Sequence, residues 1–236
     1  MKERKTFKKI LILLMVLLTA IAFSACKDEG TATESEKLQV EETQNEPVKV
    51  PEKPEAPVTV LPEGEGPFYL SVNCTTNTVM IYTQDENGDF TVPDSVMLCS
   101  TGLDSEGMST PRGVYSLTGN RWEWLEMVDG TYGIYVTQFL GDFLFHSVPY
   151  TEYGNHGSLK PGEYDKLGTD ASHGCVRLCI RDAKWIYDNM YNIYAVEIID
   201  DENPGAFGKP EKPELDGSDY PGWDPTDAHP DNPWNR

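Results

Sequence analysis

The stretch Phe68 to Thr83 reads FYLSVNCTTNTVMIYT and gives the clearest indication of the fold. Two runs rich in aromatic and β-branched residues, Phe68 to Asn73 and Thr78 to Thr83, flank the four residues Cys74 to Asn77. Residues of these types favour strands, and a short polar segment between two such runs is typical of a turn. The stretch therefore predicts a β-hairpin.

Strand-like runs continue beyond this hairpin. A second turn at Asp85 to Asp89 leads into the next candidates, and others follow later in the chain. The runs are Phe90 to Val92, Val96 to Ser100, Tyr132 to Gln138, Phe143 to His146 and Ala195 to Ile199.

One helix is indicated late in the chain. Ala183, Ile186, Tyr187 and Met190 follow the i, i+3, i+4, i+7 spacing of a single apolar face. Many short strands and one late helix predict a mostly β domain, an antiparallel β-sandwich or barrel with one or two short helices.

The two ends of the chain differ in composition from its middle. Residues 27–66 hold 11 acidic and 4 basic side chains, and residues 201–236 hold 9 and 3, both with many prolines. Such segments bury too little apolar surface to offset the entropy of ordering, so 26–66 is expected to be a spacer and 201–236 a disordered tail. Trp223 and Trp234 could instead dock onto the domain or a partner. Residues 67–200 remain as one domain.

The first 25 residues resemble an export signal. Five basic residues lie within Lys2 to Lys9, and Ile10 to Phe23 is apolar apart from Thr19, which is short for a membrane span. The run ends Phe23-Ser24-Ala25-Cys26, which resembles a bacterial lipobox. We expect a lipid on Cys26 and a location at the outer face of the cell membrane or in the wall. A plain signal or an uncleaved anchor are the alternatives.

Net charge excludes two broad classes of function. The 236 residues contain 19 Lys plus Arg against 39 Asp plus Glu, for a net charge of −20. A chain this acidic is poorly suited to hold nucleic acid, or an anionic membrane, by charge. We therefore expect contact with a membrane only through the predicted lipid anchor.

The residues best suited to catalysis lie between His146 and Arg177. A nucleophilic cysteine requires a base and donors for the oxyanion of the tetrahedral intermediate. Cys175 follows Ser172-His173-Gly174, and a glycine before the nucleophile lets the backbone turn its N–H groups toward a substrate. His146 and His156 lie upstream, within 30 residues of Cys175. This grouping indicates Cys–His catalysis.

The segment Ser172-His173-Gly174-Cys175-Val176-Arg177 resembles the signature of the L,D-transpeptidase (YkuD) catalytic domain. Phe145-His146-Ser147 resembles the upstream histidine motif of that family, and Thr110-Pro111-Arg112-Gly113 resembles its threonine-proline-x-glycine landmark, although this last segment could be merely a turn. The resemblance covers about residues 67–200 and implies the family's β-sandwich fold.

The resemblance also implies roles for individual residues. Cys175 would be the nucleophile and His146 the general base and acid, with its imidazole oriented by the backbone carbonyl of Ser147. The remaining implied roles are the backbone N–H groups around Gly174 and Cys175 in the oxyanion hole, His173 in the pocket, and Arg177 and Tyr150 in substrate binding, with Arg177 able to hold a carboxylate bidentately.

His156 is the alternative base. His146 has strand-like flanks, and a strand positions a base more accurately than a loop does, whereas His156 lies among glycines typical of a loop. We therefore favour His146. The long interval between His146 and Cys175 would then be an insertion, a candidate lid carrying Tyr150, Tyr153 and Tyr164.

The implied reaction is 3→3 cross-linking of peptidoglycan stem peptides through a cysteine thioester, with release of D-Ala from a tetrapeptide. Family members are inhibited by carbapenems that acylate the cysteine, and no metal or nucleotide cofactor is implied. Hydrolysis of the thioester would make the protein an L,D-carboxypeptidase, and a non-catalytic cell-wall-binding module is a further alternative.

Two questions about thiols and metals stay open. Zinc could be bound by His146, His156, His173 and Cys175, although no compact helical ligand pair such as His-Glu-x-x-His is present. Cys74 and Cys99 could form a disulfide, which export permits, or be two buried thiols. Cys179, in an apolar run, is expected in the core.

Overall fold

The computed structural model describes residues 66–215 and 219–236. The predicted signal at 1–25, the lipidation at Cys26 and nearly all of the 26–66 spacer lie outside these residues. Within them, nine strands form one sheet in the order β4-β9-β1-β2-β3-β8-β7-β6-β5. The expectation of a mostly β domain with one or two short helices is confirmed.

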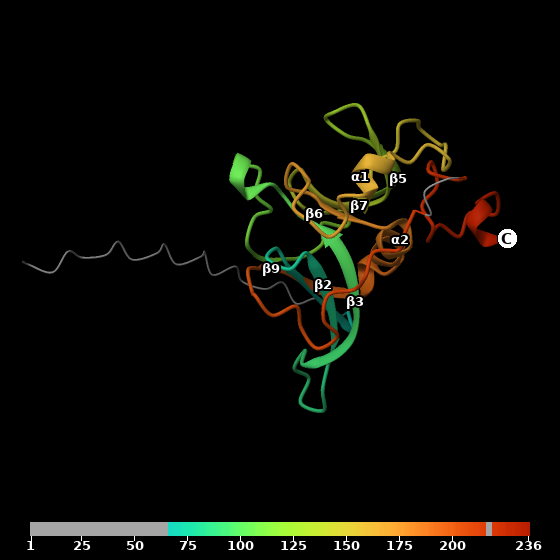
Figure 1. Cartoon of the computed structure of the whole chain (residues 1–236). Coiled ribbons are helices and arrows are strands. Elements are labelled where there is room, and N and C mark those ends of the chain that lie inside the picture. The colour runs from blue at the N-terminus through green and yellow to red at the C-terminus, as the bar shows by residue number, and fades with distance from the viewer. Residues whose placement is uncertain (1–65, 216–218) are drawn as a thin grey trace, which may run out of the picture. The chain divides into compact units, whose positions relative to one another are not determined.

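The predicted hairpin opens the sheet. Strands β1 (Phe68–Asn73) and β2 (Thr78–Thr83) have the expected bounds and pair antiparallel. Strand β3 (Val92–Ser100) joins the two halves of the sheet, because its first part pairs with β2 and its end pairs with β8 (Val176–Leu178). One long strand therefore connects the hairpin to the region of Cys175 (Figure 1).

The remaining elements lie on either side of this junction. Two strand pairs are parallel, β1 with β9 and β7 with β8, so the expectation of a fully antiparallel arrangement is wrong for them. Parallel neighbours need a crossover of a dozen or more residues, which the long segments before β8 and β9 provide. The elements are β4 (Gly113–Tyr115), β5 (Arg121–Glu126), β6 (Tyr132–Leu140), β7 (Phe143–Ser147), β9 (Ile193–Ile199), α1 (Pro161–Tyr164), α2 (Ile180–Asp188) and the 3-10 turns Asp104–Glu106, Met190–Asn192 and Pro233–Asn235.

Helix α2 carries the predicted apolar face. Ile180, Ala183 and Ile186 are buried against the sheet, and Met190 is buried in the turn that follows the helix. Each helix in the described part of the chain is too short to cross a lipid bilayer.

The segment 201–215 lies along the domain, although the composition predicted disorder. The ammonium of Lys209 donates to the carbonyl of Gly168 at 2.7 Å, and the buried hydroxyl of Tyr164 donates to the carbonyl of Pro213 at 3.0 Å. Disorder was inferred from the shortage of apolar side chains, and these contacts are polar. The expectation is wrong here.

The expectation of a disordered tail is wrong for 219–236 as well, which lies beside α2 (Figure 1). Asp224 is fully buried, and its Oδ2 accepts from the N–H of Ile180 at 2.8 Å. An Asp at this point satisfies one of the free N–H groups at the start of a helix. Asp227 pairs with His156 at 2.7 Å, so the tail joins α2 and the segment between β7 and α1.

Candidate active site

Strand pairing explains how the two catalytic motifs meet. In the parallel pair β7–β8, Phe145 lies opposite Val176 and His146 lies opposite Arg177. Side chains alternate between the faces of a sheet, so Phe145 and Val176 enter the core while His146 and Arg177 share the other face. Cys175, two residues before Arg177, lies on that same side. The long interval between the motifs is the crossover that parallel pairing requires.

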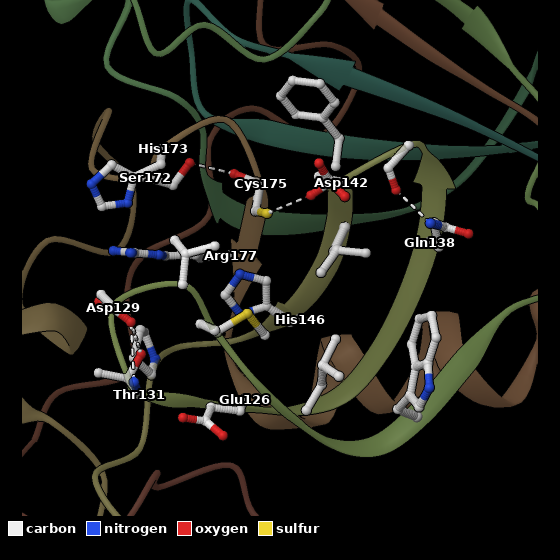
Figure 2. Close-up of a pocket in the computed structure, with 18 residues that line it drawn as sticks. Glu126, Asp129, Thr131, Gln138, Asp142, His146, Ser172, His173, Cys175 and Arg177 are labelled. Atoms are coloured by element: carbon white, nitrogen blue, oxygen red, sulfur yellow. Dashed lines mark hydrogen bonds between the residues drawn. The ribbon is translucent and has the colours of Figure 1, made fainter.

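His146 and Cys175 line one pocket of about 390 Å³ (Figure 2). The hairpin of β5 and β6 forms one wall, and the Ser172 to Arg177 segment forms another. The lining residues are Trp122, Leu125, Glu126, Met127, Val128, Asp129, Thr131, Gln138, Gly141, Asp142, Phe143, Leu144, His146, Pro149, Ser172, His173, Cys175 and Arg177.

The surroundings of His146 make it a neutral base. Its Nδ1 lies 2.6 Å from the carbonyl oxygen of Ser147, an acceptor, so Nδ1 carries the hydrogen and Nε2 keeps a lone pair. Burial first, and then the charge of Arg177, lower the pKa of His146 to about 4, although the hydrogen bond to Ser147 and the charge of Asp129 act in the opposite direction. The imidazole is therefore uncharged at neutral pH. The geometry is the one that the resemblance implies for Ser147.

The Cys175 sulfur is partly exposed and lies 3.7 Å from the carbonyl oxygen of Asp142, to which the thiol donates. Burial raises its pKa, while a hydrogen bond from the Leu144 backbone and the charge of Arg177 lower it in part. The resting sulfur is thus a thiol. A neutral thiol beside a neutral imidazole requires proton transfer as the nucleophile attacks.

The Gly174 backbone adopts a φ of +119°, and a Cβ there would lie only 2.5 Å from the Phe143 ring. Its N–H donates to the hydroxyl of Ser172 at 3.0 Å, and that hydroxyl donates to the Cys175 carbonyl at 2.5 Å. The expectation that Gly174 supplies an oxyanion donor is therefore wrong, because Ser172 uses its N–H.

Arg177 is buried, and part of its guanidinium is bound by the chain itself. Its Nη1 donates to Oε2 of Glu163 at 2.6 Å and to the carbonyl of Ala171 at 3.0 Å. Its Nε is buried with no hydrogen-bond partner among the described residues. Arg177 lines the pocket, and its role in binding an anionic group of a substrate stays a prediction.

Two residues singled out from the sequence are not in the pocket. Tyr150 is fully buried, because its backbone pairs with Tyr132 at 2.8 and 2.9 Å and directs the ring into the second core cluster, so the expectation of substrate contact is wrong. His156 is bound to Asp227 and stacks on His229. His173 is exposed at the pocket edge.

The insertion between β7 and β8 is not a lid. Among its aromatic residues Tyr164 is buried like Tyr150, and Tyr153 packs on Trp124. The pocket is lined instead by Pro149 at the start of the insertion and by Ser172 and His173 at its end. Over the pocket lies the β5–β6 hairpin, whose first strand was missed. The alternation of Trp122, Trp124 and charged neighbours in β5 is the signal that could have found it.

The structure also answers the questions on thiols. Cys74, Cys99 and Cys179 are free and buried, so the disulfide alternative is wrong. Burial raises the pKa of the Cys74 thiol to about 11, as expected for an inert cysteine. Among the described residues, no three His, Cys, Asp or Glu side chains are grouped to hold a metal ion.

Gly133 lies against the candidate base, although no sequence motif pointed to it. It lies on β6 facing His146, and a Cβ there would be 3.1 Å from Nδ1 of the imidazole and would overlap the end of Met127. The close approach of β6 to the imidazole therefore depends on glycine. An isolated Gly in a strand is a known signal of close approach.

Known proteins are similar to this chain over part of its length. The sequence model of one protein family, the L,D-transpeptidase catalytic domain (YkuD), matches residues 67–225 of this chain. A Bacillus subtilis (strain 168) protein named "Putative L,D-transpeptidase YciB" is 42% identical over 98 residues, which are 40% of this chain and 49% of that protein. The match thus spans about half the length of this relative.

Solved L,D-transpeptidases are similar over part of the chain. One from Mycobacterium tuberculosis H37Rv has a TM-score of 0.41 at 20% identity and covers 56% of this chain and 57% of that one. One from Stackebrandtia nassauensis has a TM-score of 0.42 at 16% identity and covers 62% of each. Because the family model matches more than half of the chain, and Cys175 and His146 lie within the match, the chain belongs to the L,D-transpeptidase (YkuD) catalytic domain family.

Proposed function

We propose that this protein is a peptidoglycan L,D-transpeptidase that forms 3→3 cross-links. The observation that carries the proposal is one pocket holding the Cys175 thiol and a neutral His146 whose Nδ1 is fixed by the Ser147 carbonyl. A nucleophile, a base and a group that orients the base are the parts that acyl transfer needs. Membership of the family supports the choice of stem peptides as substrate.

In the first half-reaction, Nε2 of His146 accepts the thiol proton while Cys175 attacks the carbonyl that precedes the terminal D-Ala. The tetrahedral oxyanion collapses, the C–N bond breaks, and the D-Ala amine leaves with the proton from His146. A thioester on Cys175 remains. In the second half, the side-chain amine of another stem attacks the thioester carbonyl while His146 takes its proton. The new amide bond forms, the C–S bond breaks, and His146 returns the proton to the sulfur to regenerate the thiol.

The walls of the pocket favour an amine over water as the acceptor. Trp122, Leu125 and Met127 of the β5–β6 segment contribute apolar surface beside the nucleophile. An apolar enclosure disfavours entry of water, which would otherwise hydrolyse a reactive thioester. Transfer is therefore the proposed main reaction, with hydrolysis as the competing outcome.

Mass spectrometry of the products tests the proposal. The purified protein is incubated with disaccharide-tetrapeptide, with Cys175→Ala as control. We expect a cross-linked dimer lacking one D-Ala, absent with the variant. A tripeptide monomer alone would make the protein a carboxypeptidase, and no change with either protein would favour a wall-binding module. A carbapenem is expected to add its mass to Cys175.

We also propose that the protein is exported and held by a lipid on Cys26. The support is the basic and apolar run that ends in the lipobox-like residues Phe23 to Cys26. Metabolic labelling with an alkyne fatty acid is expected to label the wild type in the membrane fraction. Equal labelling of Cys26→Ser would contradict the anchor.

A further inference from the structure

Thr110 joins two distant loops through its hydroxyl. The residue is fully buried, and its Oγ1 accepts from the N–H of Gly102 at 2.9 Å and donates to the carbonyl of Gly174 at 2.9 Å. One hydroxyl hydrogen and one lone pair are thus used. Thr110 is not among the residues that line the pocket, although it contacts the loop that carries Cys175.

The bond to Gly174 determines where the next N–H points. The carbonyl of Gly174 and the N–H of Cys175 belong to one planar, trans peptide unit, in which they point in opposite directions. With the carbonyl directed to Thr110, the Cys175 N–H points away from Thr110, and Cys175 itself lines the pocket. The Gly174 N–H and the Cys175 carbonyl are both bound to Ser172.

A constraint on this peptide is needed because glycine permits its rotation. Gly174 has a φ of +119°, and a residue without Cβ reaches several backbone conformations at similar cost. Rotation of the Gly174–Cys175 peptide would turn a carbonyl oxygen toward the pocket in place of the N–H. A carbonyl there would repel an oxyanion.

We propose that Thr110 is a positioning residue that holds the Cys175 N–H as the oxyanion donor. The inference rests on the proposed acyl-transfer function and adds a role to a residue that touches neither substrate nor nucleophile. The test therefore compares two reactions of the same sulfur. Acylation by a carbapenem passes through an oxyanion, whereas alkylation by iodoacetamide does not.

The variants are Thr110→Val, which has nearly the same shape without a hydroxyl, and Thr110→Ser, which keeps the hydroxyl. For Thr110→Val we expect the ratio of the acylation rate to the alkylation rate at Cys175 to fall about 100-fold, the effect of losing one oxyanion donor. For Thr110→Ser we expect the ratio to stay within about threefold of wild type, since the hydroxyl remains. Because iodoacetamide also alkylates unfolded chains, both rates are measured on variant protein whose circular-dichroism spectrum and melting transition match those of a folded chain.

An unchanged ratio in Thr110→Val, or an equal fall in Thr110→Ser, would overturn the inference. If Thr110→Val does not fold, Thr110→Cys replaces it, and its weaker S–H donor is expected to lower the ratio about tenfold, as measured by peptide mapping. Wild type that is alkylated but never acylated would instead refute the proposed function.

Discussion

His146 and His156 lie ten positions apart in the chain but have different surroundings. The first is on strand β7, with Nδ1 bound to a backbone carbonyl and the imidazole in the pocket of Cys175. The second is in a loop, where Nδ1 is bound to the Asp227 carboxylate of the C-terminal segment and the ring packs between Trp124 and His229. The element that carries each histidine and the group that binds its Nδ1 therefore distinguish the candidate base from the structural histidine. The distance of each histidine from Cys175 in the sequence does not.

The largest effect is expected from removing the base. His146→Ala should lower the rate of D-Ala release about 1,000-fold, within the range typical of general acid–base catalysis. His156→Ala should stay within about threefold of wild type in the same assay, since the loss of a contact outside the pocket leaves acid–base catalysis intact. The reverse result would exchange the two roles.

Gly133→Ala moves the base without removing it. The new Cβ lies 3.1 Å from the His146 Nδ1, so the imidazole must shift and weaken its bond to Ser147. We expect kcat to fall about 30-fold with KM nearly unchanged, because small misplacements of catalytic groups are costly. Gly162→Ala, which has open space around its Cβ, is the matched control. Equal kcat values for the two variants would show that the approach of β6 is unimportant.

The pH dependence of stability distinguishes the buried base from the other titrating groups. The folded pKa of His146 is about 4, below the ordinary 6.5, so the unfolded chain binds more protons between these values. The stability due to neutral His146 is complete above about pH 6.5 and decreases as the pH falls to 4, by about 3 kcal/mol. Urea unfolding between pH 7 and 4 should give a smaller decrease for His146→Gln. Parallel curves would contradict a buried neutral imidazole.

The smallest effect concerns the C-terminal segment, which holds the loop of His156. Asp224→Ala leaves the Ile180 N–H without its acceptor and should lower the free energy of unfolding by about 2 kcal/mol. Exposed Asp231→Ala is the control and should change it little. In Asp224→Ala, Cys175 should still be acylated at temperatures below the melting temperature of that variant. Equal stability of the two variants would mean that the segment does not hold α2.

Local patterns predicted much of the fold. Alternating and β-branched runs located β1, β2 and β7, because the pairing of nearby strands depends on residues close in sequence. The same patterns missed β5 and gave no warning of the parallel pairs, which depend on long-range contacts. The apolar spacing located α2 but not the Asp224 that caps it from 44 residues away.

The site was predictable in its residue types and less so in its details. The family signature pointed to Cys175 and His146, and the fold brings both into one pocket. The burial of Tyr150, the use of the Gly174 N–H by Ser172, and the contact of Glu163 with Arg177 all depend on three-dimensional packing. Composition did not predict the order of the tail because several of its anchors are polar groups, among them the buried Asp224 and Asp227, which resemble exposed residues in a sequence.

Trapping of the acyl-enzyme tests the central claim most directly. The donor disaccharide-tetrapeptide is mixed with enzyme, quenched in acid, and the modified peptide is located by mass spectrometry. We predict a disaccharide-tripeptide thioester on Cys175 in wild type and in His156→Ala, and none in His146→Ala. An adduct on another cysteine, or one that forms in His146→Ala and not in His156→Ala, would contradict the account.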